Sequence, residues 1–438
     1  MRIVIDVIYL LVALAIAPWV VYRMVRYGRY RTGWAHRFGR IIRKDPALKK
    51  CIWLHAVSVG EVNAAKTIVK ELENRFGDFE ILITTTTDTG FARASEIFGA
   101  QHKVFYFPLD FSWIMRCVFR NIQPAICLLM ELEVWPNFVQ IADQLNIPVI
   151  VVNGRISDKS FSKYKKIRPI AKKILQKVTL ILAQTDEYAQ RFKEIGAPKK
   201  KVAVTGSLKY DTAQITDKVE GAKALAADLK IKKQRLWVAG ATGNDEEKIL
   251  LDVFQDLKQQ GQFKDLRLAI IPRKPERFDE VAQLIKQTGF SLIRYSQVKG
   301  LTAEKSRIEN RESRIEVVIL GDTMGDLRKF YSLATIIFVG RSLVPMGGSD
   351  MAEAAALGKP TLFGPHAFNF KQTVDALLED SGAIMVKDEQ GLFETMQKCL
   401  TEPDFAEEIA KNGQNVIRKN QGATKKTIDQ IAKFLNTA

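Results

Sequence analysis

Three short stretches of the sequence place acidic or basic side chains directly after an apolar run. HAVSVGE ends at Glu61, MELEVWPN contains Glu131 and Glu133, and TGSLKYD contains Lys209. A carboxylate within reach of a hydroxyl can act as a general base, and a lysine can neutralise a phosphate or a carboxylate. Because alternate residues of an extended stretch point the same way, Glu131 and Glu133 are expected to share a face.

Each of these residues also has a purely structural explanation. Glu61 follows a glycine turn, and an acid in the first turn of a helix stabilises that helix by roughly a few tenths of a kcal/mol. One of the two glutamates in MELEVWPN can pair with a neighbouring base, and Lys209 can be an ordinary surface lysine. The spacing alone leaves both interpretations open.

The second half of the sequence contains features suited to binding an anion. IPRKPER follows an apolar run, and its arginine can form paired hydrogen bonds to a phosphate or carboxylate. GDTMGDL and GGSDMAE are turns at predicted helix starts, where backbone N–H groups can cradle a phosphate and a nearby acid suits ribose hydroxyls. The candidate anion-binding residues are Pro272, Arg273, Met324, Gly325, Asp326, Gly347, Gly348, Ser349, Asp350 and Glu353.

Several classes of protein are disfavoured by what the sequence lacks. There is no GxxxxGK[ST] phosphate loop, no GxSxG nucleophile elbow and no DxD pair that would hold a metal–nucleotide complex. The four histidines show no metal-ligand spacing, so no metal cofactor is expected. The four cysteines are scattered without a CxxC pair, which is typical of reduced thiols.

The net charge of +17 is concentrated in two blocks. Residues 23–50 contain ten Lys or Arg and one acid, and residues 155–177 contain nine Lys or Arg and one acid. Such blocks are compatible with a solvated surface, with an anionic membrane and a phosphorylated substrate, or with nucleic acid. No helix-turn-helix, RNP or zinc-finger signature supports nucleic acid, so none is expected as a partner.

The N-terminal segment 1–22 is predicted to be a membrane anchor. Ile3 to Tyr22 is apolar except for Asp6, and twenty residues at about 1.5 Å each can cross a bilayer. Small residues in this stretch also permit a cleaved signal peptide. The positive charge that follows the apolar stretch favours a retained anchor with that side in the cytoplasm. Whether the helix spans the membrane or lies on it is left open.

The elements that position these motifs form an α/β pattern. Continuous apolar runs alternate with helical periodicity, as expected for parallel strands covered on both faces. The polar stretch 207–233 interrupts the pattern, which predicts two doubly wound domains facing a cleft. The domains are placed at 23–209 and 210–403, with helices at 404–438 packing back on the first domain. A charged excursion is expected at 300–314. The predicted strands are 51–57, 79–84, 104–107, 125–130, 149–152, 180–183, 202–205, 236–239, 268–271, 291–294, 317–320, 336–339 and 361–363.

Taken together, the motifs resemble those of a known family. HAVSVGE, MELEVWPN, TGSLKYD, IPRKPER, GDTMGDL, the GG–E–AA turn, GPHAFNF and NQGA occur in this order. This set closely resembles the lipid IVA 3-deoxy-D-manno-octulosonic acid (Kdo) transferases, and the resemblance covers nearly the whole chain. It implies an inverting, metal-independent GT-B glycosyltransferase at the cytoplasmic face of the inner membrane. Such an enzyme moves Kdo from CMP-Kdo to the lipid A precursor lipid IVA.

The resemblance also implies roles for individual residues. Glu61 matches the general base of the family, and Glu131 and Lys209 match positions assigned to stabilising the transition state. With low burial, Glu61 is expected to keep a pKa near about 4.3 and to be ionised at neutral pH. The implied CMP contacts fall on Pro272, Arg273, Met324, Gly325, Asp326, Asp350, Met351, Ala352 and Glu353, with a phosphate turn at Gly347, Gly348 and Ser349.

The sequence departs from the family pattern at two places. Where relatives commonly have Asn-Pro, this chain has Ser349-Asp350-Met351, which puts the detail of donor binding in question; His36 stands where relatives often have Glu. Two alternatives remain: a related transferase using another activated sugar, or a catalytically silent sugar-nucleotide-binding protein. No motif gives the number of Kdo residues transferred.

Overall fold

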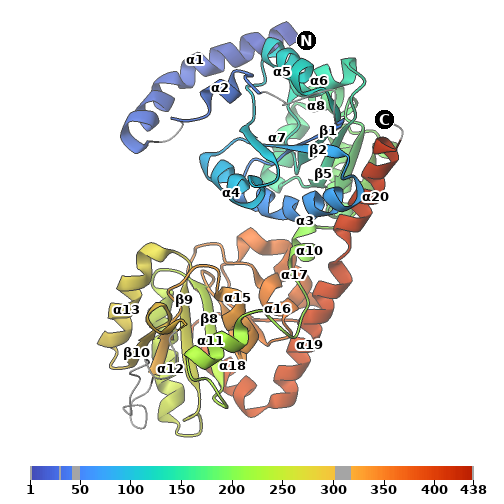
Figure 1. Cartoon of the computed structure of the whole chain (residues 1–438). Helices are drawn as coiled ribbons and strands as arrows, with labels where there is room; N and C mark the ends of the chain where they lie inside the picture. Colours follow the sequence, from blue (N-terminus) through green and yellow to red (C-terminus); the bar gives the residue numbers. More distant parts are fainter. Residues whose placement is uncertain (1, 29–30, 42–49, 301–316, 437–438) are drawn as a thin grey trace. The chain divides into compact units, whose positions relative to one another are not determined.

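The computed structural model describes residues 2–28, 31–41, 50–300 and 317–436. The chain divides into two compact units (Figure 1). Unit 1 comprises Met1–Thr212 together with Asn420–Ala438, and unit 2 comprises Ala213–Lys419. The chain therefore passes from one unit to the other twice. The excursion expected at 300–314 lies outside the described residues except for Gly300.

Unit 1 is built on a seven-stranded sheet with the order β3-β2-β1-β4-β5-β6-β7. Every neighbouring pair is parallel, as the continuous apolar runs predicted. The strands are β1 (Lys50–His55), β2 (Phe79–Thr85), β3 (Lys103–Tyr106), β4 (Pro124–Met130), β5 (Val149–Gly154), β6 (Leu180–Ala183) and β7 (Val202–Val204).

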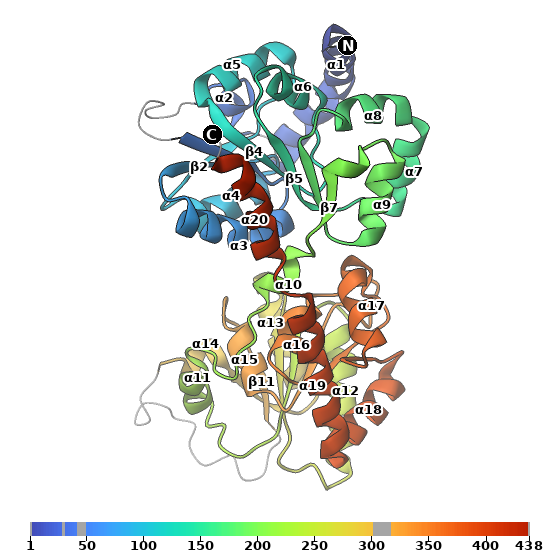
Figure 2. The same cartoon turned by 90° about the vertical axis from the view of Figure 1, so that its right-hand side faces the viewer.

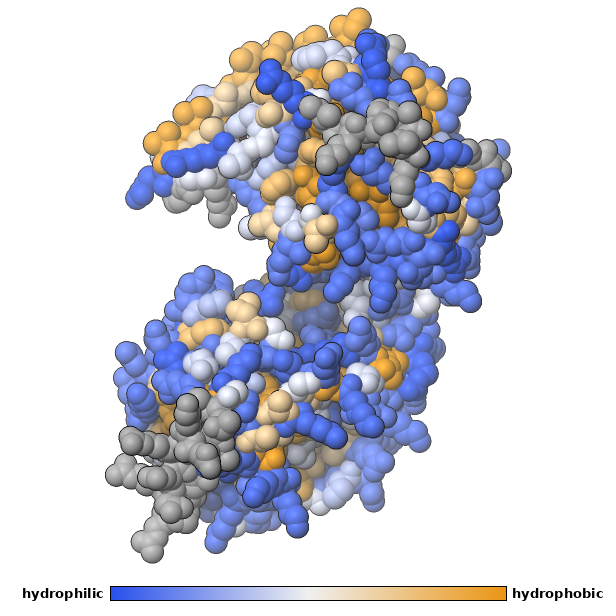
Figure 3. All heavy atoms as spheres, viewed as in Figure 1, coloured by the Kyte–Doolittle hydropathy of each residue, from blue (hydrophilic) through white to orange (hydrophobic). Residues whose placement is uncertain are grey.

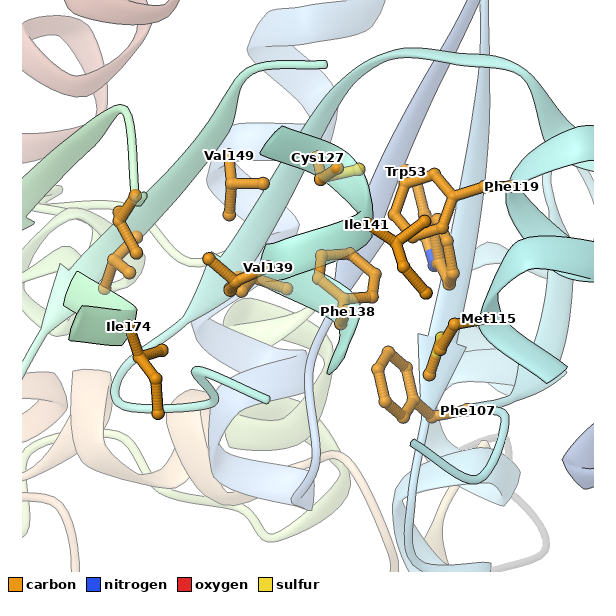
Figure 4. Close-up of a cluster of buried hydrophobic side chains, with 14 of the residues drawn as sticks. Trp53, Phe107, Met115, Phe119, Cys127, Phe138, Val139, Ile141, Val149 and Ile174 are labelled. Atoms are coloured by element: carbon orange, nitrogen blue, oxygen red, sulfur yellow. The ribbon is translucent and has the colours of Figure 1, made fainter. Parts of the chain in front are cut away.

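Both faces of this sheet are buried. One face packs against α5 (Ser112–Ile122), α6 (Pro136–Gln144) and α8 (Arg168–Leu175), and Figure 4 shows its aromatic centre. The ring of Trp53 lies 5.3 Å from that of Phe119 and 4.9 Å from that of Phe138. The other face packs against α3 (Val59–Arg75), α4 (Asp88–Phe98) and α20 (Ala423–Leu435). Unit 1 also contains α7 (Asp158–Lys166), α9 (Asp186–Glu194) and α10 (Leu208–Thr212).

The first helix, α1 (Arg2–Tyr27), contacts α5 and α6 of unit 1. Its segment Ile3–Arg26 has a mean hydropathy of 2.5, and none of its most apolar window is buried inside the molecule. Length and composition would allow this helix to cross a membrane, although a signal sequence passes the same test. A short helix, α2 (Trp34–Arg37), follows it.

Unit 2 repeats the architecture with the strand order β10-β11-β9-β8-β12-β13-β14. The sequence did not predict β14, which has two residues, one of them exposed, and so lacks an apolar run. The strands are β8 (Leu236–Thr242), β9 (Arg267–Pro272), β10 (Ser291–Arg294), β11 (Val317–Leu320), β12 (Ile336–Val339), β13 (Thr361–Phe363) and β14 (Ile384–Met385). The helices are α11 (Ala222–Asp228), α12 (Glu246–Gln259), α13 (Phe278–Gln287), α14 (Tyr295–Val298), α15 (Leu327–Leu333), α16 (Met351–Ala356), α17 (Lys371–Glu379), α18 (Glu389–Thr401) and α19 (Pro403–Asn420).

The compact units differ from the predicted domain bounds at two points. The first passage between units lies after Thr212 rather than after residue 209, because α10 packs on α3. The segment 404–438 was expected to pack as a whole on the first domain. Instead, α19 belongs to unit 2 up to Lys419, and only α20 covers the unit 1 sheet, as seen beside α3 in Figure 2.

Candidate active site

Glu61 occupies the third position of α3 and closes the start of that helix. The Ser58 hydroxyl accepts a hydrogen bond from the Glu61 N–H at 3.4 Å. In return, the Glu61 carboxylate accepts from the Ser58 hydroxyl at 2.8 Å and from the Val57 N–H at 2.9 Å. This is a capping box, so the structural interpretation of Glu61 is confirmed. Each carboxylate oxygen has two lone pairs and uses one, so capacity to accept a further proton remains.

The expected low burial of Glu61 is wrong. The residue is only 8% exposed. Burial raises the pKa of Glu61 above its usual value, and the charge of Glu131 raises it further, while the hydrogen bonds from Val57 and Ser58 lower it in part. A carboxylate with a raised pKa is a stronger base than an exposed glutamate. The structural and catalytic interpretations are therefore compatible in one residue.

Glu131 and Glu133 lie at the same edge of the sheet as Glu61, but they lie in a turn and not on the extended segment that was predicted. β1 and β4 are neighbours in a parallel sheet, so the turns after both strands lie at one edge. Glu131 has a left-handed backbone with φ of 54°, and its N–H donates to the Val152 carbonyl at 2.9 Å. The segment turns here instead of staying extended. A left-handed glutamate costs energy and is a known mark of functional sites.

The carboxylates in these turns interact electrostatically. Burial, followed by the charges of Glu61 and Glu131, raises the pKa of Glu133 to about 7. Glu133 lies half-buried and its field also reaches Tyr164. The spacing in MELEVWPN suggested a pair of acids; the structure brings a group of three together.

Lys209 lies half-buried on α10, which packs on α3, the helix that carries Glu61. The position of α10 is fixed by the Leu208 N–H, which donates to Asn153 at the end of β5, 3.1 Å away. Asp211 accepts hydrogen bonds from the backbone of Gly422 and Thr424. The TGSLKYD motif is therefore bound to the NQGA motif, a connection that their distance in sequence concealed.

A second group forms in unit 2 around Glu353. Burial and the neighbouring charge of Asp350 raise the pKa of Glu353, and Arg328 and Arg273 lower it in part. Arg273 is exposed just beyond the end of β9, and its N–H donates to the Thr242 carbonyl at 3.1 Å. Arg328 was not predicted, although it directly follows the GDTMGDL motif. The group combines two guanidinium groups and two carboxylates, which suits a ligand with both a phosphate and hydroxyls.

The GDTMGDL turn has two buried acids, Asp322 and Asp326, and an open tip. Asp326 accepts hydrogen bonds from Lys299 at 2.6 Å, Lys329 at 2.7 Å and Thr323 at 2.7 Å. Although burial raises the pKa of Asp326, these bonds lower it to about 2. Asp326 therefore fixes the turn. Met324 is 71% exposed, and Gly325, with φ of 83°, is exposed beside it.

The glycine turn before α16 is shaped by the GPHAFNF segment. Gly347 and Gly348 have φ of 91° and 79°, and a Cβ on Gly347 would lie 2.0 Å from the Asn369 amide nitrogen. Asp350 caps α16 by accepting from the Ala352 N–H at 2.9 Å. Ser349 donates to the Ala241 carbonyl at 3.4 Å. Met351 and Ala352 are buried in the first turn, so their side chains face the protein.

Glu246 is a further buried acid that the sequence motifs did not indicate. Glu246, at the start of α12, is fully buried and accepts from the N–H groups of Ser342 at 2.7 Å and Leu343 at 2.9 Å. It thereby holds the loop after β12. An EE pair at a helix start gives no signal for a partner almost a hundred residues away. Among residues 2–28, 31–41, 50–300 and 317–436, no group of three or more His, Cys, Asp or Glu is arranged to hold a metal ion.

Comparison with known proteins identifies the family. The family model described as 3-deoxy-D-manno-octulosonic-acid transferase (kdotransferase) matches residues 32–212. The 3-deoxy-D-manno-octulosonic acid transferase of Haemophilus influenzae is 32% identical over 416 residues, which cover 94% of this chain and 93% of that protein. The enzyme of the same name from Bordetella pertussis is 30% identical over 416 residues, covering 91% of each chain.

Solved structures support the fold. A glycosyltransferase from Rickettsia africae superposes with a TM-score of 0.57 at 13% identity, covering 89% of this chain and all of that one. UDP-GlcNAc 2-epimerase from Neisseria meningitidis gives a TM-score of 0.56 at 15% identity, covering 88% of this chain and 100% of that one. At such identities the likeness shows the fold alone, with its two parallel sheets. This chain belongs to the 3-deoxy-D-manno-octulosonic acid transferase family and is a glycosyltransferase with the GT-B fold.

Proposed function

We propose that the chain transfers Kdo from CMP-Kdo to the lipid A precursor lipid IVA, with inversion at the anomeric carbon and Glu61 as general base. The observation that carries the proposal is the buried carboxylate of Glu61, which forms no ion pair within the described part of the chain and belongs to the acidic group after β1 and β4. The acceptor hydroxyl gives its proton to Glu61 as its oxygen bonds to the anomeric carbon. The bond from that carbon to the CMP phosphate oxygen breaks.

Unit 2 is proposed to hold CMP-Kdo. Arg273 and Arg328 would bind the phosphate, and Glu353 would accept hydrogen bonds from ribose hydroxyls. Two guanidinium groups supply positive charge for the leaving phosphate, which supports a reaction without a metal. Glu131 and Lys209 are proposed to stabilise charge that develops on the sugar and on the donor. α1 and the basic residues of unit 1 would attach the enzyme to the cytoplasmic face of the inner membrane.

The Ser349-Asp350-Met351 turn is compatible with this proposal. Asp and Asn are equally good residues at the start of a helix, and Asp350 makes that hydrogen bond to Ala352. The departure from the usual Asn-Pro therefore keeps the geometry of α16. What it adds is a negative charge beside Glu353.

The test is transfer of labelled Kdo from CMP-Kdo to a tetraacylated lipid A precursor in the presence of EDTA. Glu61→Gln should lose more than about a hundredfold in rate, as expected for loss of a general base. Glutamine also closes a capping box, so the variant should fold. Glu71→Gln, on the same helix but paired with Arg75, is the matched control and should keep the activity.

The outcomes separate the alternatives. Product mass gives the number of sugars added. Failure of the folded parent protein to use CMP-Kdo, with transfer from another activated sugar, would support a related transferase with a different donor. Binding of CMP-Kdo without transfer would support a silent binding protein. Equal activity of Glu61→Gln and the parent would reject Glu61 as the base.

A further inference from the structure

Asp6, the single acid in the apolar N-terminal stretch, is bound to the folded part of unit 1. Its carboxylate accepts from the Ser112 N–H at 2.9 Å, from the Ser112 hydroxyl at 2.5 Å and from the Asn137 amide at 2.9 Å. One turn further along α1, the Tyr9 hydroxyl donates to Asp110 at 3.0 Å. We call this group of Asp6, Tyr9, Asp110, Ser112 and Asn137 the latch.

The latch is a built contact rather than a chance one. Asn137 is fully buried, and Asp110 and Ser112 are less than a tenth exposed. Asp110 itself accepts from the N–H groups of Asn137 at 2.9 Å and Phe138 at 2.7 Å, so it closes the start of α6. The Tyr9 ring packs edge-on against Phe111, with centroids 6.0 Å apart. The beginning of α1 is therefore held at the N-terminal ends of α5 and α6.

The other end of α1 is tied to the same unit. The Arg31 side chain donates to the carbonyls of Met24 at 2.8 Å and Val25 at 3.3 Å and so closes the end of the helix. The Thr32 hydroxyl lies 3.0 Å from that of Tyr106 on β3. Thr32 follows the end of α1 by only five positions, a distance that an extended chain spans in at most about 18 Å.

A helix with both ends on one folded unit cannot cross a bilayer, because the hydrocarbon core is about 30 Å thick and would separate those ends. We infer that α1 lies in the plane of an anionic lipid bilayer, within one leaflet, with the latch and Thr32 both on the side of unit 1. The inference rests on the membrane attachment included in the proposed function. It specifies how α1 is oriented in that attachment.

The outer surface of α1 fits this partner. Thirteen large apolar side chains of α1 are at least 47% exposed, and Figure 3 shows hydrophobic residues gathered over the helix. Trp113 beside the latch and Phe38 beyond the other end are 57% and 61% exposed, and such aromatic rings favour the membrane interface. Arg23, whose guanidinium lies 4.8 Å from the Trp19 ring, and Arg26 provide charge for anionic headgroups. The thirteen residues are Ile3, Val4, Val7, Ile8, Leu10, Leu11, Val12, Leu14, Ile16, Trp19, Val21, Tyr22 and Val25.

The latch also connects the membrane to the acidic group of the candidate site. Asn137 belongs to the MELEVWPN motif and lies four positions after Glu133. Its amide donates both to Asp6 and to the Asp110 carbonyl, the latter at 2.6 Å. A lipid acceptor would therefore meet the acidic group close to the leaflet in which α1 lies.

The test measures on which side of the membrane the start of α1 lies. A short polar tag with one cysteine is placed before Met1 of the full chain carrying Cys117→Ser, and a membrane-impermeant maleimide is added to bacterial spheroplasts and to inverted inner-membrane vesicles. We expect labelling in inverted vesicles only. In a separate sample of the untagged protein, the native Cys117, which is exposed on α5, reports the side of unit 1; Cys51, Cys127 and Cys399 are buried. Labelling of the tag in spheroplasts would overturn the inference.

Variants of the latch sharpen the result. Asp6→Leu removes the acceptor and makes the apolar run continuous, so it should gain labelling in spheroplasts. Asp6→Asn keeps an acceptor oxygen and should behave like the parent, as should Val12→Leu, an apolar change on the exposed surface of α1. Unchanged labelling of Asp6→Leu would overturn the role of the latch.

The readout does not depend on Kdo transfer. A chain that fails to transfer Kdo but is labelled in inverted vesicles only would reject the proposed reaction and support the in-plane helix. A chain found in the soluble fraction, or one that has lost its N-terminal tag by cleavage, would overturn both the in-plane helix and the membrane attachment.

Discussion

The acidic group of unit 1 and the GDTMGDL turn of unit 2 use carboxylates in opposite ways. In unit 1, the buried Glu61 and the half-buried Glu133 interact electrostatically, and burial raises the pKa of each. In unit 2, Asp326 is more deeply buried, but two lysines hold it and its pKa falls to about 2. The difference lies in the partners and not in the depth. The raised pKa of Glu61 suits it to accept a proton, whereas the two lysines keep Asp326 ionised and fix its turn.

The largest effect on stability is expected where the acid is paired. Asp326→Ala removes three hydrogen bonds, two of them from partly exposed lysines, and should lower the free energy of unfolding by about 2–3 kcal/mol. Denaturant unfolding would measure this. Asp279→Ala, which breaks an exposed pair with Arg294, is the control and should change the stability by less than about 1 kcal/mol.

In the acidic group, removing a carboxylate is expected to increase the free energy of unfolding at high pH and not to lower it. The pKa of Glu133 is raised in the folded protein, so its protonation stabilises the fold at low pH, and this contribution is lost as pH rises through about 7. Glu133→Gln should therefore be more stable than the parent at pH 8, on the order of 1 kcal/mol, but not at pH 4. Equal stability differences at both pH values would show that the carboxylate is not responsible.

A smaller effect should appear in the pH dependence of transfer. If Glu61 is the base, the rate should fall at acid pH as Glu61 becomes protonated; burial, and then the charge of Glu131, raise the pKa of Glu61. Glu131→Gln removes the carboxylate charge that acts on Glu61 and should move this acid limb to lower pH. The profile of kcat/KM against pH measures the shift, separately from any loss of rate. A limb that stays in place would argue against electrostatic coupling between the two glutamates.

The smallest effect is expected at the turn before α16. Asp350→Asn keeps the helix start, so the free energy of unfolding should change by less than about 0.5 kcal/mol. The substitution removes a negative charge beside Glu353, whose pKa should fall. As a result, the binding of CMP, measured by calorimetry, should become tighter. Weaker binding would mean that Asp350 contacts the ligand favourably.

Sequence patterns predicted the architecture because it depends on local composition. Continuous apolar runs placed thirteen of the fourteen strands in the described residues, and only β14, with two residues, was missed. The position of Glu61 at a helix start followed from its serine-glycine turn in the same way. These features need only neighbours in the chain.

The environment of the site could not be predicted, because it depends on distant contacts. The burial of Glu61 comes from the packing of separate elements. The left-handed backbone at Glu131 could not be predicted because the residue is not a glycine. The loop held by Glu246 and the arrangement of Arg328 with Glu353 also require the folded sheet. The assignment of α19 to unit 2 and of α20 to unit 1 depends on which sheet has a face left to cover, which the sequence does not reveal.

The packing of α20 has a consequence for how the molecule is made. Ile428 and Ile431 of α20 are fully buried in the core of unit 1. Because α20 follows unit 2 in the chain, the core of unit 1 can be completed only after all of unit 2 has been synthesised. Until then unit 1 presents an uncovered apolar face, at a time when α1 is already available to lipid. Unit 1 is synthesised first but is completed last, so we expect the nascent chain to depend on chaperones mainly through the exposed apolar face of unit 1.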